Sequence, residues 1–147
     1  MTTPAHSAGS RSRGFTLIEL MIALAVVAIL VRIAFPSYQA YIVRSSRQAA
    51  QSELVELANA QEKIYLNSSP SAYTTSVTGA YTGQSTGGLG VTSGKTKDGR
   101  YTFTDPIVAT ATTFTLTATP VTGTPQAGDG NLTITETGKR TWGSKSW

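Results

Sequence analysis

The longest apolar run of the chain lies near its N-terminus, at residues 15–35, where only Thr16, Glu19 and Arg32 are polar. About 20 consecutive apolar residues are enough to cross a bilayer as an α-helix, so this run predicts a membrane-spanning helix. An ionisable group inside such a helix is costly and by default marks a functional position. Glu19, near the start of the run, is therefore a candidate functional residue.

Helical periodicity continues beyond this run. Residues 47–66 contain strong helix formers and neither glycine nor proline. Several apolar residues and one glutamine recur there at spacings of three and four, which predicts a helix face packed against a sheet. These residues are Leu54, Leu57, Ala58, Gln61, Ile64 and Tyr65. We therefore expect one long helix that ends near Asn67.

Pro36 lies inside this predicted helix, where a proline removes one backbone hydrogen bond and is expected to kink or loosen the helix. It separates an apolar half, residues 15–36, from an amphipathic half, residues 37–66. The apolar half suits a membrane or a shared filament core. The amphipathic half is expected to support a head formed by residues 67–147.

The head begins with a region rich in Ser, Thr and Gly. Residues 67–100 show no clear period, which predicts a long irregular connection. Residues 101–104, 113–119 and 131–137 then alternate apolar residues with threonine, as is typical of half-buried strands. Short links favour an antiparallel meander, and the segment "TGKR" predicts a turn into a last short strand through Trp142. The predicted fold class is α+β, with a long helix packed on a small antiparallel sheet.

The first 14 residues are polar, with Arg11 and Arg13 near their end. In an ordinary secretory signal the apolar region precedes the cleavage site. Here the obvious processing point, Gly14, comes before the apolar run, so cleavage would leave that run on the mature chain. The two arginines would hold the N-terminal side in the cytoplasm, and the rest of the chain would face outward.

The segment "RGFTLIELMIALAVVAIL", followed by "AFPSYQAY", resembles the class III leader and N-terminal helix of type IV pilins and pseudopilins. The resemblance covers roughly residues 13–41. It implies cleavage between Gly14 and Phe15 by a prepilin peptidase, methylation of the new Phe15 amine, and assembly with other pilin subunits by an inner-membrane machinery. The chain would then pass from the bacterial inner membrane into an extracellular filament.

The resemblance also suggests what Glu19 does. Cleavage would create an amine at Phe15, one helical turn away, and the Glu19 carboxylate of one subunit would pair with the Phe15 amine of another. Such a pair offsets desolvation only when both partners are present, so Glu19 would favour a subunit docked in register. Alternatively, Glu19 lies shallow enough to reach lipid headgroups. Arg32 departs from the family, which usually has a small apolar residue there; it either snorkels to the outer interface or meets an acidic group of a neighbour.

A second resemblance lies in the C-terminal half. The strand ending in "TATP", the "QAGD" segment, "LTIT" and "TGKR" resemble the PilE-type minor pilins. Members usually have a disulfide between a cysteine just before the "NLTIT" strand and one beside the terminal tryptophan, whereas this chain has no cysteine. Residues 138–147 are therefore expected to be looser, or to be held by packing of Trp142 and Trp147.

Composition excludes several kinds of chemistry. The absence of cysteine excludes a thiol nucleophile and a cysteine-based zinc site. The only histidine, His6, lies in the predicted leader, so we expect neither an enzyme nor a cofactor. The segment "GGLGVTSGKT" mimics a phosphate-binding loop but has Leu89 where the first glycine is required.

Three aspartates of the head, Asp98, Asp105 and Asp129, are candidate calcium ligands. Their spacing matches no recognised calcium loop. Asp98 and Asp129 each precede a glycine, which favours their interpretation as turn residues. We therefore expect no metal.

The basic residues of the head form two groups: Lys95, Lys97 and Arg100, and Lys139, Arg140 and Lys145. If both groups meet, they form a basic patch with Tyr101 and Trp142 nearby, which suits DNA phosphates and base stacking. A DNA-receptor minor pilin of natural transformation belongs to the same broad group. Solubilising surface charge is the alternative interpretation.

These observations favour a structural subunit of a type IV pilus. The PilE-like C-terminal half indicates a minor pilin that aids pilus assembly, twitching motility, adhesion or DNA uptake. One alternative is a type II secretion pseudopilin, which works as a periplasmic piston. The other is a DNA-binding pilin receptor for natural transformation.

Overall fold

The computed structural model describes residues 14–147. The predicted leader lies outside the described residues apart from Gly14, and so does His6. The chain divides into two compact units, Met1–Tyr38 and Gln39–Trp147. We describe each unit by itself.

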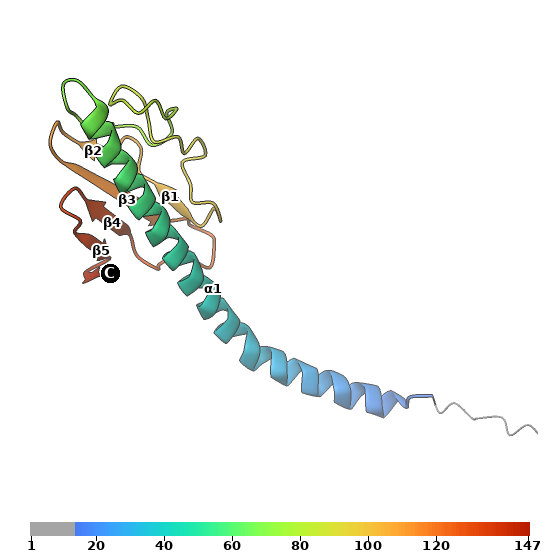
Figure 1. Cartoon of the computed structure of the whole chain (residues 1–147). Coiled ribbons are helices and arrows are strands. Elements are labelled where there is room, and N and C mark those ends of the chain that lie inside the picture. The colour runs from blue at the N-terminus through green and yellow to red at the C-terminus, as the bar shows by residue number, and fades with distance from the viewer. Residues whose placement is uncertain (1–13) are drawn as a thin grey trace, which may run out of the picture. The chain divides into compact units, whose positions relative to one another are not determined.

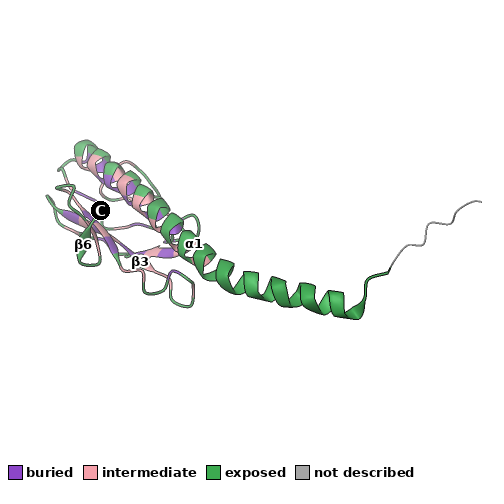
Figure 2. Ribbon diagram, turned by 90° about the horizontal axis from the view of Figure 1, so that it is seen from below, coloured by how far each residue is buried: buried purple, intermediate pink, exposed green. Residues whose placement is uncertain are grey.

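Helix α1, Leu17–Asn67, begins in the first unit and ends in the second (Figure 1). All its side chains in the first unit are exposed (Figure 2), and an 18-residue window of the helix is apolar enough to cross a membrane. The helical assignment passes through Pro36 without a break. The expected kink at Pro36 stays a prediction.

In the second unit, α1 lies along one face of the sheet (Figure 1). Its buried side chains are Ser46, Ala50, Leu54, Leu57, Ala58, Gln61 and Ile64. The predicted packing face is therefore confirmed. Tyr65 is only half-buried, because it lies at the margin of this face and stacks on Tyr73 with ring centroids 4.8 Å apart.

The sheet is antiparallel throughout. Its strands are β1 (Tyr101–Phe103), β2 (Val108–Ala109), β3 (Phe114–Pro120), β4 (Leu132–Thr135), β5 (Arg140–Trp142) and β6 (Lys145–Ser146). The order is β1-β3-β4-β5-β6, so the predicted meander is confirmed from β3 onward. Strand β2 also pairs with β3. Ala118 pairs with β1 on one side and β4 on the other, and Thr115 pairs with β2 on one side and β4 on the other, so β1 and β2 lie along the same edge of β3. The sequence did not predict β2 and β6, because two residues cannot show an alternating pattern.

The alternation along the strands separates two faces. Phe114, Leu116 and Ala118 on β3, with Leu132 and Ile134 on β4, are buried. Threonines occupy the intervening positions and are partly exposed. The buried residues form one core with the inward face of α1, which confirms the predicted α+β fold.

The connection between α1 and β1 is irregular, as predicted, but it is part of the core. Tyr73, Val77 and Leu89 are buried with the sheet residues. The Gln61 side-chain amide, itself fully buried, donates to the Thr74 carbonyl at 2.8 Å and accepts from the Thr74 backbone N–H at 3.0 Å. These bonds satisfy backbone groups that a buried loop would otherwise leave unpaired.

Candidate functional site

The C-terminal hairpin, which we define as residues 140–147, carries cations and indoles on one face. Arg140 lies opposite Ile134 and Trp142 lies opposite Leu132 in the β4–β5 ladder. Directly opposed residues share a face of an antiparallel sheet, so Arg140 and Trp142 lie on the core side. Lys145 lies opposite Trp142 in the β5–β6 ladder and belongs to the same face.

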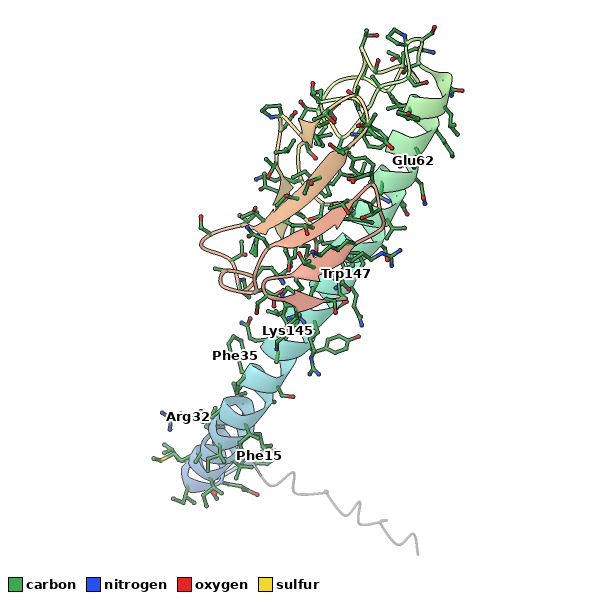
Figure 3. The ribbon with its side chains drawn as sticks, turned by 90° about the vertical axis from the view of Figure 1, so that its left-hand side faces the viewer. Phe15, Arg32, Phe35, Glu62, Lys145 and Trp147 are labelled. Atoms are coloured by element: carbon green, nitrogen blue, oxygen red, sulfur yellow. The ribbon has the colours of Figure 1, made fainter. Side chains whose placement is uncertain are left out.

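Each indole of this hairpin lies beside a cation. The Arg140 guanidinium carbon lies 5.2 Å from the ring centroid of Trp147, and the Lys145 ammonium lies 5.4 Å from that of Trp142. Figure 3 shows Lys145 on the last strand, β6, and Trp147 directly after it. An aromatic ring attracts a cation at this distance but does not cancel its charge. The indoles therefore orient the cations and leave them able to bind an anion.

The hairpin could bind phosphate groups. Arginine presents a planar fork that matches phosphate oxygens, and lysine acts as a point charge. Arg140 and Lys145 are exposed, and so is Lys139 in the preceding turn. The nearest acidic residue of the turn, Glu136, accepts a hydrogen bond from the Phe114 backbone N–H at 3.3 Å.

The other predicted basic group lies elsewhere. Lys95 forms a bridge with Thr102 of β1, so residues 95–100 lie at the β1 edge of the sheet, whereas the hairpin forms the opposite edge. Strands β3 and β4 separate the two groups, which therefore do not form the single patch that we considered. The sequence could not reveal this, because strand order is a property of the folded sheet.

Acidic residues of α1 accompany the basic residues at the β1 edge. The Lys97 backbone N–H donates to the Glu53 carboxylate at 3.1 Å, and its ammonium lies 3.9 Å from Glu56. The Arg100 backbone N–H donates to Asp98 at 3.1 Å. Three carboxylates, Glu53, Glu56 and Asp98, therefore lie among these cations and offset part of the positive field at this edge.

The basic patch expected from the sequence required Tyr101 to stack on bases, but Tyr101 cannot do so. Its side chain is fully buried, and its hydroxyl donates to the Asp129 carboxylate. Burial and this hydrogen bond raise the pKa of Tyr101 well above its ordinary value. Tyr101 is a core residue with a polar tip, not a surface aromatic.

The interpretation of Asp129 as a turn residue is incomplete. Its carboxylate accepts from Nε of Arg47 at 2.8 Å, from a second nitrogen of the same guanidinium, and from the Gln126 amide at 2.8 Å. Burial by itself would raise the pKa of Asp129, but the hydrogen bonds from Arg47 and Tyr101 outweigh it and hold the pKa below its usual range. No local signal could reveal Arg47, which lies 82 residues away.

The other two aspartates have separate roles. Asp98 accepts from the Thr96 hydroxyl at 2.7 Å, which confirms its interpretation as a turn residue. Asp105 accepts from the backbone N–H groups of Val77 and Thr78 at 3.2 and 3.1 Å. Within residues 14–147, no group of three or more His, Cys, Asp or Glu side chains could hold a metal ion. The calcium alternative therefore has no support in this part of the chain.

The predicted N-terminal site residues lie at the start of α1. The Thr16 hydroxyl oxygen accepts from the Glu19 backbone N–H at 3.3 Å, so Thr16 caps the helix. Phe15, Glu19 and Arg32 are exposed, and Arg32 projects away from the helix (Figure 3). The roles of Gly14 and Phe15 in processing and of Glu19 in assembly stay predictions.

An exposed apolar helix followed by an amphipathic half packed on an antiparallel sheet is the architecture expected of type IV pilins. Residues 9–34 match the prokaryotic N-terminal methylation motif. Residues 36–133, more than half of the chain, match a family described as "Type IV minor pilin ComP, DNA uptake sequence receptor". The chain therefore belongs to the ComP family of type IV minor pilins. The matched range ends within β4, so the C-terminal hairpin lies outside it.

Curated relatives are pilus proteins. The chain is 47% identical over 58 residues to the type IV major fimbrial protein FimA of Dichelobacter nodosus, covering 40% of this chain and 37% of FimA. It is 44% identical over 55 residues to the type IV major pilin protein PilA of Myxococcus xanthus, covering 37% of this chain and 25% of PilA. It is 48% identical over 54 residues to a fimbrial protein of Pseudomonas aeruginosa, covering 37% of this chain and 35% of that protein. The match thus spans between a quarter and somewhat more than a third of the length of these relatives.

Proposed function

We propose that the chain is a structural, minor subunit of a type IV pilus, made at the inner membrane and then assembled into an extracellular filament. The observation that carries this proposal is the apolar half of α1, whose residues are all exposed. An apolar surface of this size is stable only in a membrane or against other subunits. The methylation motif supports processing by a prepilin peptidase between Gly14 and Phe15.

Mass spectrometry of filaments sheared from cells tests this proposal. We expect a chain that begins at methylated Phe15 and is present at a low ratio to the most abundant pilin. A dominant amount would identify a major subunit. A processed chain that stays in the membrane and is absent from sheared filaments would favour a type II secretion pseudopilin.

Glu19→Ala tests the pairing of Glu19 with the Phe15 amine of a neighbour. We expect the variant to be processed but largely absent from filaments, because the amine would be buried without a partner. Arg32→Ala is the matched control, since it removes the other charge of the same apolar run. Normal incorporation of Glu19→Ala would contradict the role of Glu19, and normal incorporation of Arg32→Ala would leave Arg32 as a residue that only reaches the interface.

A second function, DNA binding by the head, is favoured by two independent observations. The description of the family to which the chain belongs includes the words "DNA uptake sequence receptor". The hairpin also presents Arg140 and Lys145 beside indoles, and within residues 14–147 neither cation forms an ion pair. Phosphate contacts of this kind give a sequence-independent, salt-dependent affinity for DNA.

Charge reversal tests this second function. Lys139→Glu with Arg140→Glu should weaken binding of a labelled duplex DNA pool of random sequence by the detergent-solubilised full chain by up to about a hundredfold. Incorporation into pili should be unchanged, which controls for folding. Equal binding by the variant and the natural chain would show that the hairpin takes no part.

A further inference from the structure

Three segments of the second unit meet at Arg47. They are the middle of α1, the connection between β3 and β4, and the C-terminal hairpin. The Arg47 guanidinium binds the Asp129 carboxylate through two nitrogens, and its carbon lies 3.6 Å from the ring centroid of Trp142. The Trp142 indole N–H donates to the backbone carbonyl of Asp129. Each of the three residues therefore contacts the other two, and we call this group the Arg47 clamp.

Buried groups fix Asp129 within the clamp. Its side chain is 5% exposed, and that of Arg47 is 17% exposed. The Gln126 amide nitrogen lies within hydrogen-bond distance of Asp129 at 2.8 Å, of the Tyr101 hydroxyl at 2.9 Å and of the Val43 carbonyl on α1 at 3.2 Å. The Asp129 carboxylate is thus held by residues of the helix, of β1 and of its own connection, whereas the hairpin contacts only its backbone carbonyl.

The approach of Trp142 depends on one glycine. Gly130 has φ of +96°, a conformation that other residues rarely adopt, and a Cβ there would lie 3.2 Å from the Trp142 indole nitrogen. The segment "DGN" therefore combines the carboxylate that binds Arg47 with the space that admits the indole.

The hairpin has further links to the sheet. It forms three residue pairs with β4, and the hydroxyl oxygens of Thr141 and Thr133 lie 2.6 Å apart. Trp147, whose indole N–H donates to Thr141 at 2.9 Å, packs against the core. The β6 side chains are exposed. Trp142 is the hairpin residue that Arg47 holds, and through it the hairpin is linked to α1 and to Asp129.

We propose that Arg47 and Asp129 are positioning residues for DNA binding, which hold the hairpin where Arg140 and Lys145 reach phosphates together. This inference rests on the proposed DNA-binding function. Two nitrogens of the Arg47 guanidinium donate to Asp129 and one of its faces lies on Trp142, so we assign Arg47 a positioning role and not a phosphate contact. Arg47 acts through the Trp142 indole, beside which the Lys145 ammonium also lies.

Positioning and simple electrostatics predict opposite results for one substitution. Asp129→Asn removes a negative charge, so attraction of DNA by net charge predicts equal or tighter binding. Positioning predicts weaker binding, because the amide cannot hold Arg47 as a carboxylate does and the hairpin is released. The matched control is Glu56→Gln, which makes the same charge change at a side chain that is 69% exposed and whose one ion pair is 3.9 Å long.

The experiment measures binding of a labelled random-sequence duplex pool by the full chain in detergent, over a series of salt concentrations. Asp129→Asn should bind about tenfold more weakly, whereas Glu56→Gln should bind equally or slightly more tightly. The slope of log affinity against log salt should fall by about one for each phosphate that the variant no longer binds, although no cation has been removed. Arg47→Lys, which keeps the charge without the planar fork, should also bind more weakly.

Hydrogen exchange separates release of the hairpin from unfolding. In Asp129→Asn, amides of the hairpin should exchange faster, while those of β1, β3 and β4 should keep their protection. Binding by Asp129→Asn that equals or exceeds that of the natural chain would overturn the proposal, and so would unchanged hairpin exchange. Failure of the natural chain to bind DNA would instead refute the proposed function, and the exchange data would then decide whether Arg47 and Asp129 position the hairpin at all.

Discussion

Two groups of cations lie at opposite edges of the same sheet, and they differ in what accompanies them. Lys97 and its neighbours at the β1 edge lie beside Glu53 and Glu56, whereas Arg140 and Lys145 of the hairpin lie beside indoles. A carboxylate neutralises a cation, but an aromatic ring only orients it. The number of basic residues therefore does not define a DNA-binding surface; the partner of each cation does.

Charge reversal at each edge should produce the strongest contrast. Arg140→Glu with Lys145→Glu should weaken binding of a labelled DNA duplex by about a hundredfold, because two phosphate contacts become repulsive. Lys95→Glu with Lys97→Glu, which makes the same charge change at the β1 edge, should weaken it by less than about threefold. Fluorescence anisotropy at fixed salt measures both. Equal losses would remove the distinction between the edges.

A smaller change in affinity is expected when a carboxylate replaces an indole in the hairpin. Trp147→Glu would give Arg140 the kind of partner found at the β1 edge, and binding should fall by about tenfold. Trp147→Leu removes the ring without adding charge and should cost only about threefold. If both variants bind equally, neutralisation of the cation is not what distinguishes the two edges.

Acid should act on the hairpin edge through Asp129. Because hydrogen bonds hold the pKa of Asp129 below its usual range in the folded chain, its stabilising contribution is present above about pH 4 and is lost as the pH falls through the lower folded value. Both tryptophans of the chain, Trp142 and Trp147, lie in the hairpin, so tryptophan emission follows this edge alone. The emission should shift to longer wavelength in acid. Asp129→Asn should already show the shifted emission near neutral pH, and an unshifted emission in this variant would contradict the role of Asp129.

Only a slight change in affinity is expected when the β1 edge is made more like the hairpin. Glu53→Gln with Glu56→Gln leaves Lys95 and Lys97 without carboxylates, and DNA binding should rise about two- to threefold. The same anisotropy measurement detects this change. A larger rise, to the level of a second binding surface, would show that the glutamates alone mask this edge.

Much of the fold follows from local patterns. The stripe from Leu54 to Ile64 predicted the packed face of α1, and alternation predicted the inward residues of β3 and β4. Such patterns work because period 3.6 and period 2 are fixed by backbone geometry. For residues 138–147, the sequence predicts one short strand. It leaves open whether these residues are loosely held or are fixed by packing of Trp142 and Trp147. The second is the one observed, since Trp142 and Trp147 pack against the core.

The candidate site depends on long-range arrangement and could not be predicted in the same way. The ion pair of Arg47 with Asp129 joins residues 82 positions apart, and an arginine on a helix surface is usually solvated. The strand order placed the two basic groups at opposite edges, although the sequence shows them only as two similar clusters. The prediction of Tyr101 near a surface patch was wrong, and its own alternation with Phe103 indicated burial.

The Arg47 clamp also determines how the C-terminal region depends on the redox state of its surroundings. A hairpin held by an ion pair and an indole needs no oxidant and no disulfide-forming enzyme to reach its final arrangement, and thiol reagents cannot release it. The hairpin should therefore keep its place when the surroundings change from oxidising to reducing.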